Sequence, residues 1–195
     1  LLSVHMKEMT TEEIIPKLKR REIDAALLAT PLMENGLTEH KLFNEEFYVY
    51  ASKSELLPKK KYVLPGDLNI NHLWLLEEGH CMRNQILNIC NRKKTDEQKP
   101  LEYNTDSVET LKRMVELNKG ITLLPELSIS DFSVKQLDRV RYFKTPEPSR
   151  EISIVTHRNF LKRRLILILE KEIIEAIPKR MRSKKKKEIM EIKPD

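Results

Sequence analysis

The chain has 195 residues, of which 39% are hydrophobic, and its formal net charge is +6. This length allows one large domain or two small ones, with enough apolar residues for a core. Only two cysteines are present, and they lack CxxC spacing, which argues against a disulfide-stapled secreted domain and favours a cytoplasmic protein. We find no secretory signal and no apolar run long enough to span a membrane.

Most of the positive charge lies at the carboxyl end. Residues 178–195 contain eight Lys or Arg and three Asp or Glu, so they supply +5 of the +6. The body therefore lacks the basic face that grips nucleic-acid phosphates. A basic run such as 179–195 is typically a solvated tail, and we assign it no role.

The first quarter of the chain predicts a strand–helix–strand unit. Thr10 and Glu13 have the spacing of a capping box at the helix start. This order is typical of a parallel α/β sheet. The expected elements are a strand over 1–7, a helix over 11–21, a strand over 23–28 and two extended pieces within 37–50.

The rest of the chain continues the α/β pattern. Gly120 is expected to end a helix in a left-handed conformation. The expected elements are a loop-rich stretch over 51–70, strands over 73–76, 101–103, 121–125, 140–143 and 151–156, and helices opening near Cys81, near Val108 and over 160–177.

Two stiff connectors, 47–50 and 144–148, bracket the central segment. The simplest architecture is therefore two α/β lobes joined by two crossovers. Residues 1–47 with 146–178 form one lobe, 48–145 form the other, and 179–195 form the tail. A cleft between two lobes is the default ligand site.

Both cysteines lie in the segment 79–90, where a strand, a tight loop and a helix are expected in that order. A cysteine in the first turn of a helix feels the partial positive charge of unpaired backbone N–H groups. His80 and Arg83 could favour the thiolate further. Cys81 is therefore the candidate reactive sulfur, and Cys90 is its possible partner.

The spacing of the two cysteines adds a mechanical argument. Nine helical residues separate two Cα atoms by about 13 Å, whereas a disulfide needs them within about 7 Å. Bonding Cys81 to Cys90 would thus require the helix to unwind. The competing interpretation is that both are ordinary small buried residues. The spacing does not suit a zinc site, and no metal or cofactor is expected.

Several motifs resemble the peroxide-sensing LysR-type transcriptional regulators. The specific one is the block Leu76–Gln85 with Cys90, and Gly120–Pro125 alone indicates only a LysR-type effector domain. Weaker similarity covers most of the body. The matching segments are 8–24, 76–85 with Cys90, 107–111, 120–125 and 146–150.

This resemblance implies a fold. It predicts two Rossmann-like α/β subdomains joined by two crossovers, as in periplasmic binding proteins, with the second subdomain carrying the redox cysteines. The chain would be the regulatory domain only, without the amino-terminal winged helix-turn-helix. It would also lack the first strand and helix of the first subdomain.

The resemblance also implies a mechanism. Hydrogen peroxide would oxidise Cys81 to a sulfenic acid, and Cys90 would condense with it to form a disulfide. The peroxide-binding residues would be Thr11, Gly79, His80 and Arg150. Thr11 could equally be a helix-start residue without a ligand, and Arg150 a surface residue of a strand.

The implied partners are those of a regulator rather than an enzyme. They are hydrogen peroxide, promoter DNA, RNA polymerase and a reductant such as glutaredoxin or thioredoxin. The chain would also pair with other copies of itself, as a dimer of regulatory domains and as a tetramer at full length. No membrane partner is expected. Asn84 departs from the aspartate of many relatives.

Two alternatives stay open. One is a LysR-type or periplasmic-type domain for a small organic ligand, with incidental cysteines. The other is a thiol peroxidase, which ranks last because a distant cysteine pair would require refolding in every cycle.

Overall fold

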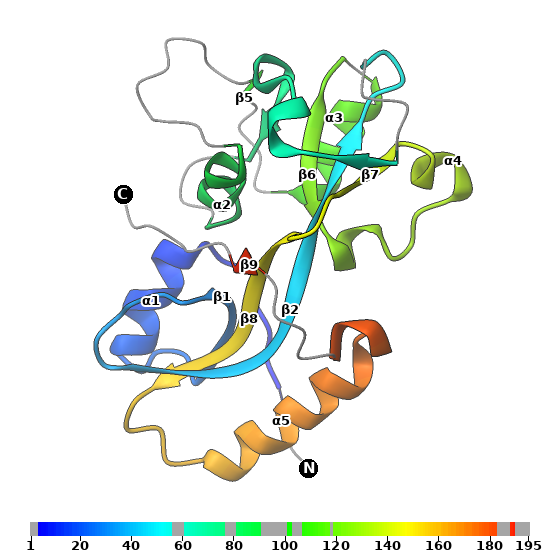
Figure 1. Cartoon of the computed structure of the whole chain (residues 1–195). Coiled ribbons are helices and arrows are strands. Elements are labelled where there is room, and N and C mark those ends of the chain that lie inside the picture. Colours follow the sequence, from blue (N-terminus) through cyan, green and yellow to red (C-terminus); the bar gives the residue numbers. More distant parts are fainter. Residues whose placement is uncertain are drawn as a thin grey trace.

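Two long antiparallel strands organise the fold (Figure 1). The computed structural model describes residues 4–55, 61–76, 81–90, 101–102, 107–117, 119–182 and 188–189. Strand β2 (Leu37–Ala51) pairs with β8 (Pro148–His157) from Leu37 opposite His157 to Glu46 opposite Ser149. Strand β1 (Ala25–Thr30) adds to the other edge of β8, again antiparallel. We call β1, β8 and residues 37–46 of β2 the first sheet region.

Beyond Glu46, strand β2 changes partners. Residues 47–51 pair with β6 (Ile121–Pro125), and residues 48–50 pair on the other side with β7 (Val140–Phe143). The two-residue strand β3 (Tyr62–Val63) lies parallel to β7. We call this the second sheet region. One strand is thus shared by both regions.

The alternation of side chains along β2 fills two cores of the second sheet region. Successive residues of a strand point to opposite faces. Phe47, Val49 and Ala51 lie in the larger core, with residues of β4, α2 and α3. Tyr48 and Tyr50 lie in the other core, with Phe132 and Val140. Residues one apart therefore belong to different hydrophobic clusters.

Helices cover both sheet regions (Figure 1). Helix α1 packs Ile14 and Leu18 against Leu28 and Val155 of the first region. Among the described residues, no helix is long and apolar enough to cross a membrane. The helices are α1 (Thr11–Lys19), α2 (Cys81–Ile89), α3 (Val108–Leu117), α4 (Val134–Leu137) and α5 (Arg163–Ala176), with 3-10 turns η1 (Pro65–Asp67), η2 (Ile70–His72), η3 (Glu126–Ile129) and η4 (Lys179–Arg182). The remaining strands are β4 (Trp74–Leu75), β5 (Leu101–Glu102) and β9 (Glu188–Ile189).

Several local predictions are confirmed. The Thr10 side chain accepts from the Glu13 backbone N–H and the Glu13 side chain accepts from that of Thr10, which is the capping box. Strands β6 and β7 have the predicted bounds. Helix α1 ends at Lys19 rather than Arg21, and the two extended pieces expected within 37–50 are one strand with a bulge between Lys41 and Phe43.

Two predictions for the amino-terminal part are wrong. The described residues 4–7 of the expected first strand form no strand, and Val4 and Met6 are 65% and 92% exposed. An apolar pattern becomes a strand only where a neighbouring strand pairs with it. The second error is the parallel arrangement, because β1 lies antiparallel to β8.

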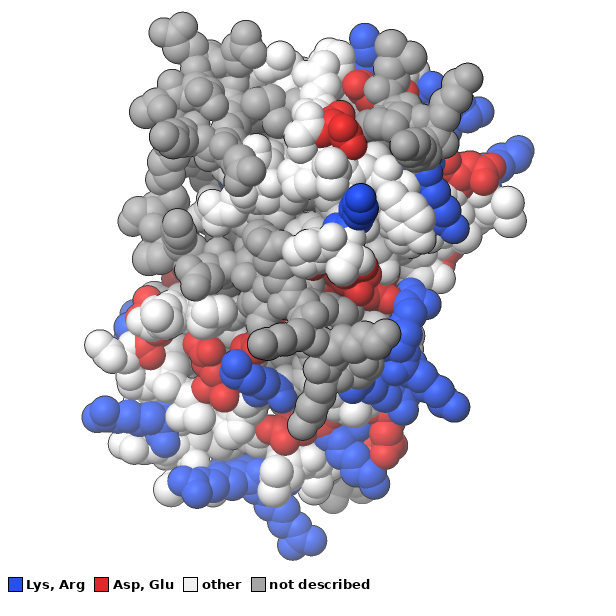
Figure 2. All heavy atoms as spheres, viewed as in Figure 1, with Lys and Arg blue, Asp and Glu red and all other residues white. Residues whose placement is uncertain are grey.

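The basic carboxyl end is not simply a solvated tail. Met181 of η4 is 1% exposed and packs with Phe43, Ile152 and Ile177. Arg182 donates to the Ile177 carbonyl oxygen at 3.0 Å. Strand β9 pairs in parallel with β8. On the face shown in Figure 2, Lys and Arg lie among Asp and Glu over both sheet regions.

The predicted division into lobes stays a prediction. It assigns 1–47 with 146–178 to one lobe and 48–145 to the other. The change of strand partners along β2, between Glu46 and Phe47, falls beside that boundary.

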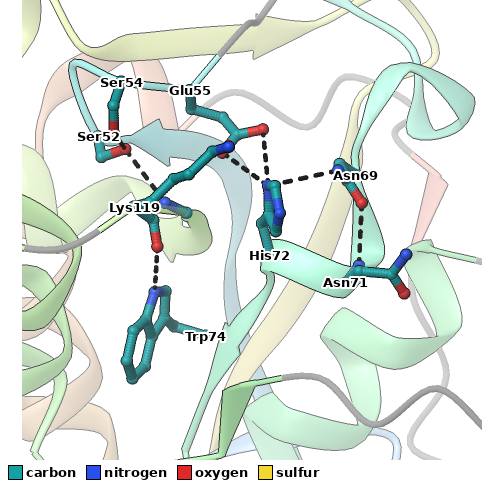
Figure 3. Close-up of polar contacts among 9 residues, drawn as sticks. Ser52, Ser54, Glu55, Asn69, Asn71, His72, Trp74 and Lys119 are labelled. Atoms are coloured by element: carbon teal, nitrogen blue, oxygen red, sulfur yellow. Dashed lines mark hydrogen bonds and ion pairs between the residues drawn. The ribbon is translucent and has the colours of Figure 1, made fainter.

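A close contact fixes strand β4, from which the chain leads toward α2. Gly120 has a φ of +136°, and the Trp74 Nε1–H donates to the Lys119 carbonyl at 3.1 Å (Figure 3). The Ser52 Oγ accepts from the Gly120 N–H at 3.1 Å. His72, just before β4, contacts the Glu55 carboxylate at 3.1 Å. These contacts seat β4 beside the start of β6.

We expect Gly120→Ala to destabilise the fold. A Cβ at Gly120 would lie 2.5 Å from the His72 carbonyl oxygen and 2.6 Å from Trp74 Nε1, in a conformation that L side chains rarely adopt. Urea unfolding should show a loss of about 2 kcal/mol or more. Gly66→Ala is the control, because no atom lies within 4 Å of its added Cβ. Equal effects of the two substitutions would contradict this account.

Candidate functional site

Helix α2 spans the distance between the two cysteines. It begins at Cys81 and ends at Ile89, and the Cys90 N–H still donates to the Ile86 carbonyl at 3.1 Å. The predicted helix opening at Cys81 is confirmed. A rise of 1.5 Å per residue separates the Cα atoms of Cys81 and Cys90 by about 13 Å. Cys90 is partly buried against the larger core of the second sheet region.

A buried arginine fastens the first turn of α2. The Arg83 side chain is 8% exposed, and its Nη1 donates to the Leu76 carbonyl oxygen at 3.0 Å. Leu76 follows β4 directly, so this bond joins the end of β4 to the first turn of α2. Gly79 and His80 of the predicted site lie outside the described residues, as does the side chain of Cys81.

Arg150 lies on β8, directly opposite Glu45 of β2. Its Nε and Nη2 both lie 2.8 Å from Glu45 Oε2, and the other carboxylate oxygen accepts from the Leu127 N–H at 2.9 Å. The Glu45 side chain is 2% exposed and that of Arg150 17%. The Arg150 guanidinium also lies 5.8 Å from the centre of the Phe47 ring. The carboxylate thus ties η3 to the strand pair.

Thr11 is the first residue of α1 and is partly buried. The capping is done by Thr10, which leaves the Thr11 hydroxyl outside the cap. In the described part of the chain, no hydrogen bond joins Thr11 to Arg150. The structure therefore brings Arg150 together with Glu45, and places Cys81 at the start of α2 and Cys90 directly after its end.

Sequence reasoning missed the charged pairs around β2. Glu126 of η3 is 2% exposed and bonds to Arg180 of η4, and this bond raises the pKa of the guanidinium. Burial raises the pKa of Tyr48 far above its usual value, and the Glu126 and Glu46 carboxylates add to this. Acidic residues in a strand pattern suggest a solvated face, so no local signal marked Glu45 as buried. Across the described ranges, no group of three or more His, Cys, Asp or Glu could hold a metal ion.

Comparison with known proteins identifies the family. Residues 1–170 match the family described as LysR substrate binding domain, and the chain belongs to it. The chain is 31% identical over 156 residues to the hydrogen peroxide-inducible genes activator of Haemophilus influenzae, covering 79% of this chain and 50% of that protein. It is 30% identical over 161 residues to the HTH-type transcriptional regulator EstR of Acinetobacter baylyi, covering 81% and 52%.

A solved structure shares the fold. The crystal structure of OxyR from Porphyromonas gingivalis superposes with a TM-score of 0.83 and 32% identity, covering 95% of this chain and 84% of that one. The periplasmic-binding-protein-like α/β fold predicted from the resemblance is therefore confirmed. The chain spans about half the length of the two curated relatives.

We expect the Glu45–Arg150 pair to be strongly coupled. Arg150→Ala leaves a buried carboxylate without its cation, and breaking a buried pair from one side costs about 3 kcal/mol or more. Urea unfolding should show this loss. Glu22→Ala is the control, because Glu22 meets Lys17 and Arg20 at an exposed site, where ion pairs contribute little, and its removal should lower the unfolding free energy far less. If both variants lose similar amounts of unfolding free energy, the Glu45–Arg150 pair does not stabilise the fold as described.

Proposed function

We propose that the chain is the regulatory domain of a hydrogen-peroxide-sensing transcriptional regulator, with Cys81 and Cys90 as its redox pair. The observation that carries this proposal is the position of the two cysteines at opposite ends of α2. The similarity to a peroxide-inducible genes activator and to an OxyR structure supports it.

The start of α2 suits a reactive thiolate. The first N–H groups of a helix have no partner within the helix and carry a partial positive charge. Position 81 is the first of nine helical residues. The buried cation of Arg83 follows two residues later. A thiolate, not a thiol, is the species that attacks peroxide.

The proposed chemistry consumes one peroxide for each cysteine pair. The Cys81 thiolate attacks one oxygen, the O–O bond breaks, and hydroxide leaves and is protonated to water. Cys81 is then a sulfenic acid. The Cys90 thiol displaces its hydroxyl group, which forms the disulfide and releases a second water. Two electrons pass from the two sulfurs to the peroxide.

The second step requires α2 to unwind. A Cα separation of about 13 Å must fall below about 7 Å before the sulfurs can bond. Unwinding removes Met82, Ile86 and Ile89 from the core that also contains β4 and Leu111. A bond formed within one helix would thereby change the surface of the second sheet region.

The proposed peroxide site comprises Thr11, Gly79, His80 and Arg150. As the first residue of α1, Thr11 would offer a backbone N–H that has no acceptor within the helix, beside its hydroxyl. Arg150 would bind peroxide through the guanidinium N–H groups that Glu45 leaves available.

The remaining parts of the proposal concern the whole protein. Promoter DNA would be bound by a winged helix-turn-helix outside this chain, and RNA polymerase would respond to a change in subunit pairing. Regulatory domains would pair as dimers within a tetramer. A glutaredoxin or thioredoxin would reduce the disulfide, which fits a cytoplasmic regulator that is not an enzyme.

We expect one equivalent of peroxide to create a Cys81–Cys90 disulfide in reduced protein, seen by mass spectrometry of tryptic peptides. Cys90→Ser should stop at the sulfenic acid, which a dimedone probe captures. Cys81→Ser should form neither product. Fast oxidation of the Cys81→Ser protein would contradict the assignment of the reactive sulfur.

The match to the LysR substrate binding domain family favours a second candidate, a domain that binds a small organic ligand and has incidental cysteines. Thermal stabilisation by a metabolite, equal in wild type and Cys81→Ser, would support this candidate. This candidate also requires that peroxide leave the thiols of the wild-type protein unchanged.

A further inference from the structure

One polar residue interrupts the buried face of α2. Residues at i, i+3, i+4 and i+7 share one face of a helix, and on α2 these are Met82, Gln85, Ile86 and Ile89. All four are buried, and Gln85 is 0% exposed. Within the described part of the chain, neither its Nε2 nor its Oε1 has a hydrogen-bond partner. An amide thus occupies a position where the pattern calls for an apolar side chain.

Two other buried polar residues, one in β6 and one in α2, are paired. The Thr122 hydroxyl donates to the Trp74 carbonyl at 3.0 Å, and Arg83 donates to Leu76. The Gln85 amide loses its hydrogen bonds to water on burial and gains none in return, which disfavours the folded helix. Breaks in a local rule of this kind are expected at functional sites.

We propose that Gln85 weakens α2 and thereby sets the redox equilibrium of the Cys81–Cys90 pair. This inference rests on the proposed function. Unwinding α2 returns the amide to water, and this gain offsets part of the cost of exposing Met82, Ile86 and Ile89. The two electrons and two protons released when the disulfide forms pass to peroxide or to oxidised glutathione.

The test replaces the amide without changing its length. In Gln85→Met the side chain keeps a similar volume and loses both unpaired polar atoms. Wild type and variant are equilibrated in glutathione redox buffers, and the disulfide is quantified by mass spectrometry. We expect the equilibrium constant for disulfide formation to fall about tenfold, a shift of about 30 mV toward a more easily reduced disulfide.

Ile86→Val is the matched control on the same buried face. It removes one methyl group from a residue that is 0% exposed, so it weakens α2 without touching a polar group. The equilibrium constant should therefore rise. A shift of both variants in the same direction, or an unchanged constant in Gln85→Met, would overturn the inference.

Hydrogen exchange separates this inference from the proposed function. Under reducing conditions, amides of α2 in Gln85→Met should exchange about tenfold more slowly than in wild type, because α2 opens less often. If wild type never forms the disulfide, the proposed function fails while the exchange rates still measure the effect of the amide. If the wild type forms the disulfide but the exchange rates in Gln85→Met are unchanged, the inference about Gln85 is wrong and the proposed function stands.

Discussion

The architecture depends on strand β2 belonging to both sheet regions. Residues 37–46 pair with β8, apart from the bulge between Lys41 and Phe43. Residues 47–51 pair with β6, and residues 48–50 also pair with β7. A strand has a period of two, so a slip of one residue would exchange the faces of Phe47 and Tyr48 and disrupt both adjoining cores. The register of β2 therefore positions the second sheet region and, through it, the core on which α2 packs.

Helix α2 packs on that core through contacts of different kinds, and not all of them stabilise it. Met82, Ile86 and Ile89 hold it to the core, and Arg83 holds its first turn to Leu76. The Gln85 amide is buried, and no hydrogen bond joins it to any residue that the structure describes. Nine residues are also too few for a helix to persist in water without tertiary packing. The stability of α2 therefore depends on a small number of side chains, and all of them lie between the two cysteines in the sequence.

What the sequence could predict was local. The Thr10 capping box, strand β6 and the helix opening at Cys81 each follow from residues within a few positions of one another. What it could not predict was long-range. Arg150 and its partner Glu45 are 105 positions apart, and nothing near either residue marks the pair. The expected first strand failed for the same reason, since pairing with a distant edge decides whether an extended segment becomes a strand.

The same distinction applies to the site. The placement of Cys81 and Cys90 at the two ends of a helix was predictable, because helical periodicity and the preceding loop are visible in the sequence. The unpartnered amide of Gln85 was not, because whether a glutamine reaches a partner depends on the packed core. Gly79 and His80 remain predictions.

The carboxyl-terminal turn η4 has a mechanical consequence. Met181 is inserted into the core of the first sheet region, while the adjacent Arg180 bonds to Glu126 in η3, beside the second. Torsion of one region about the long axis of β2 would therefore strain that ion pair as well as the two strands. The turn η4 thus acts as a brace against twisting, a role that its basic residues do not suggest from the sequence.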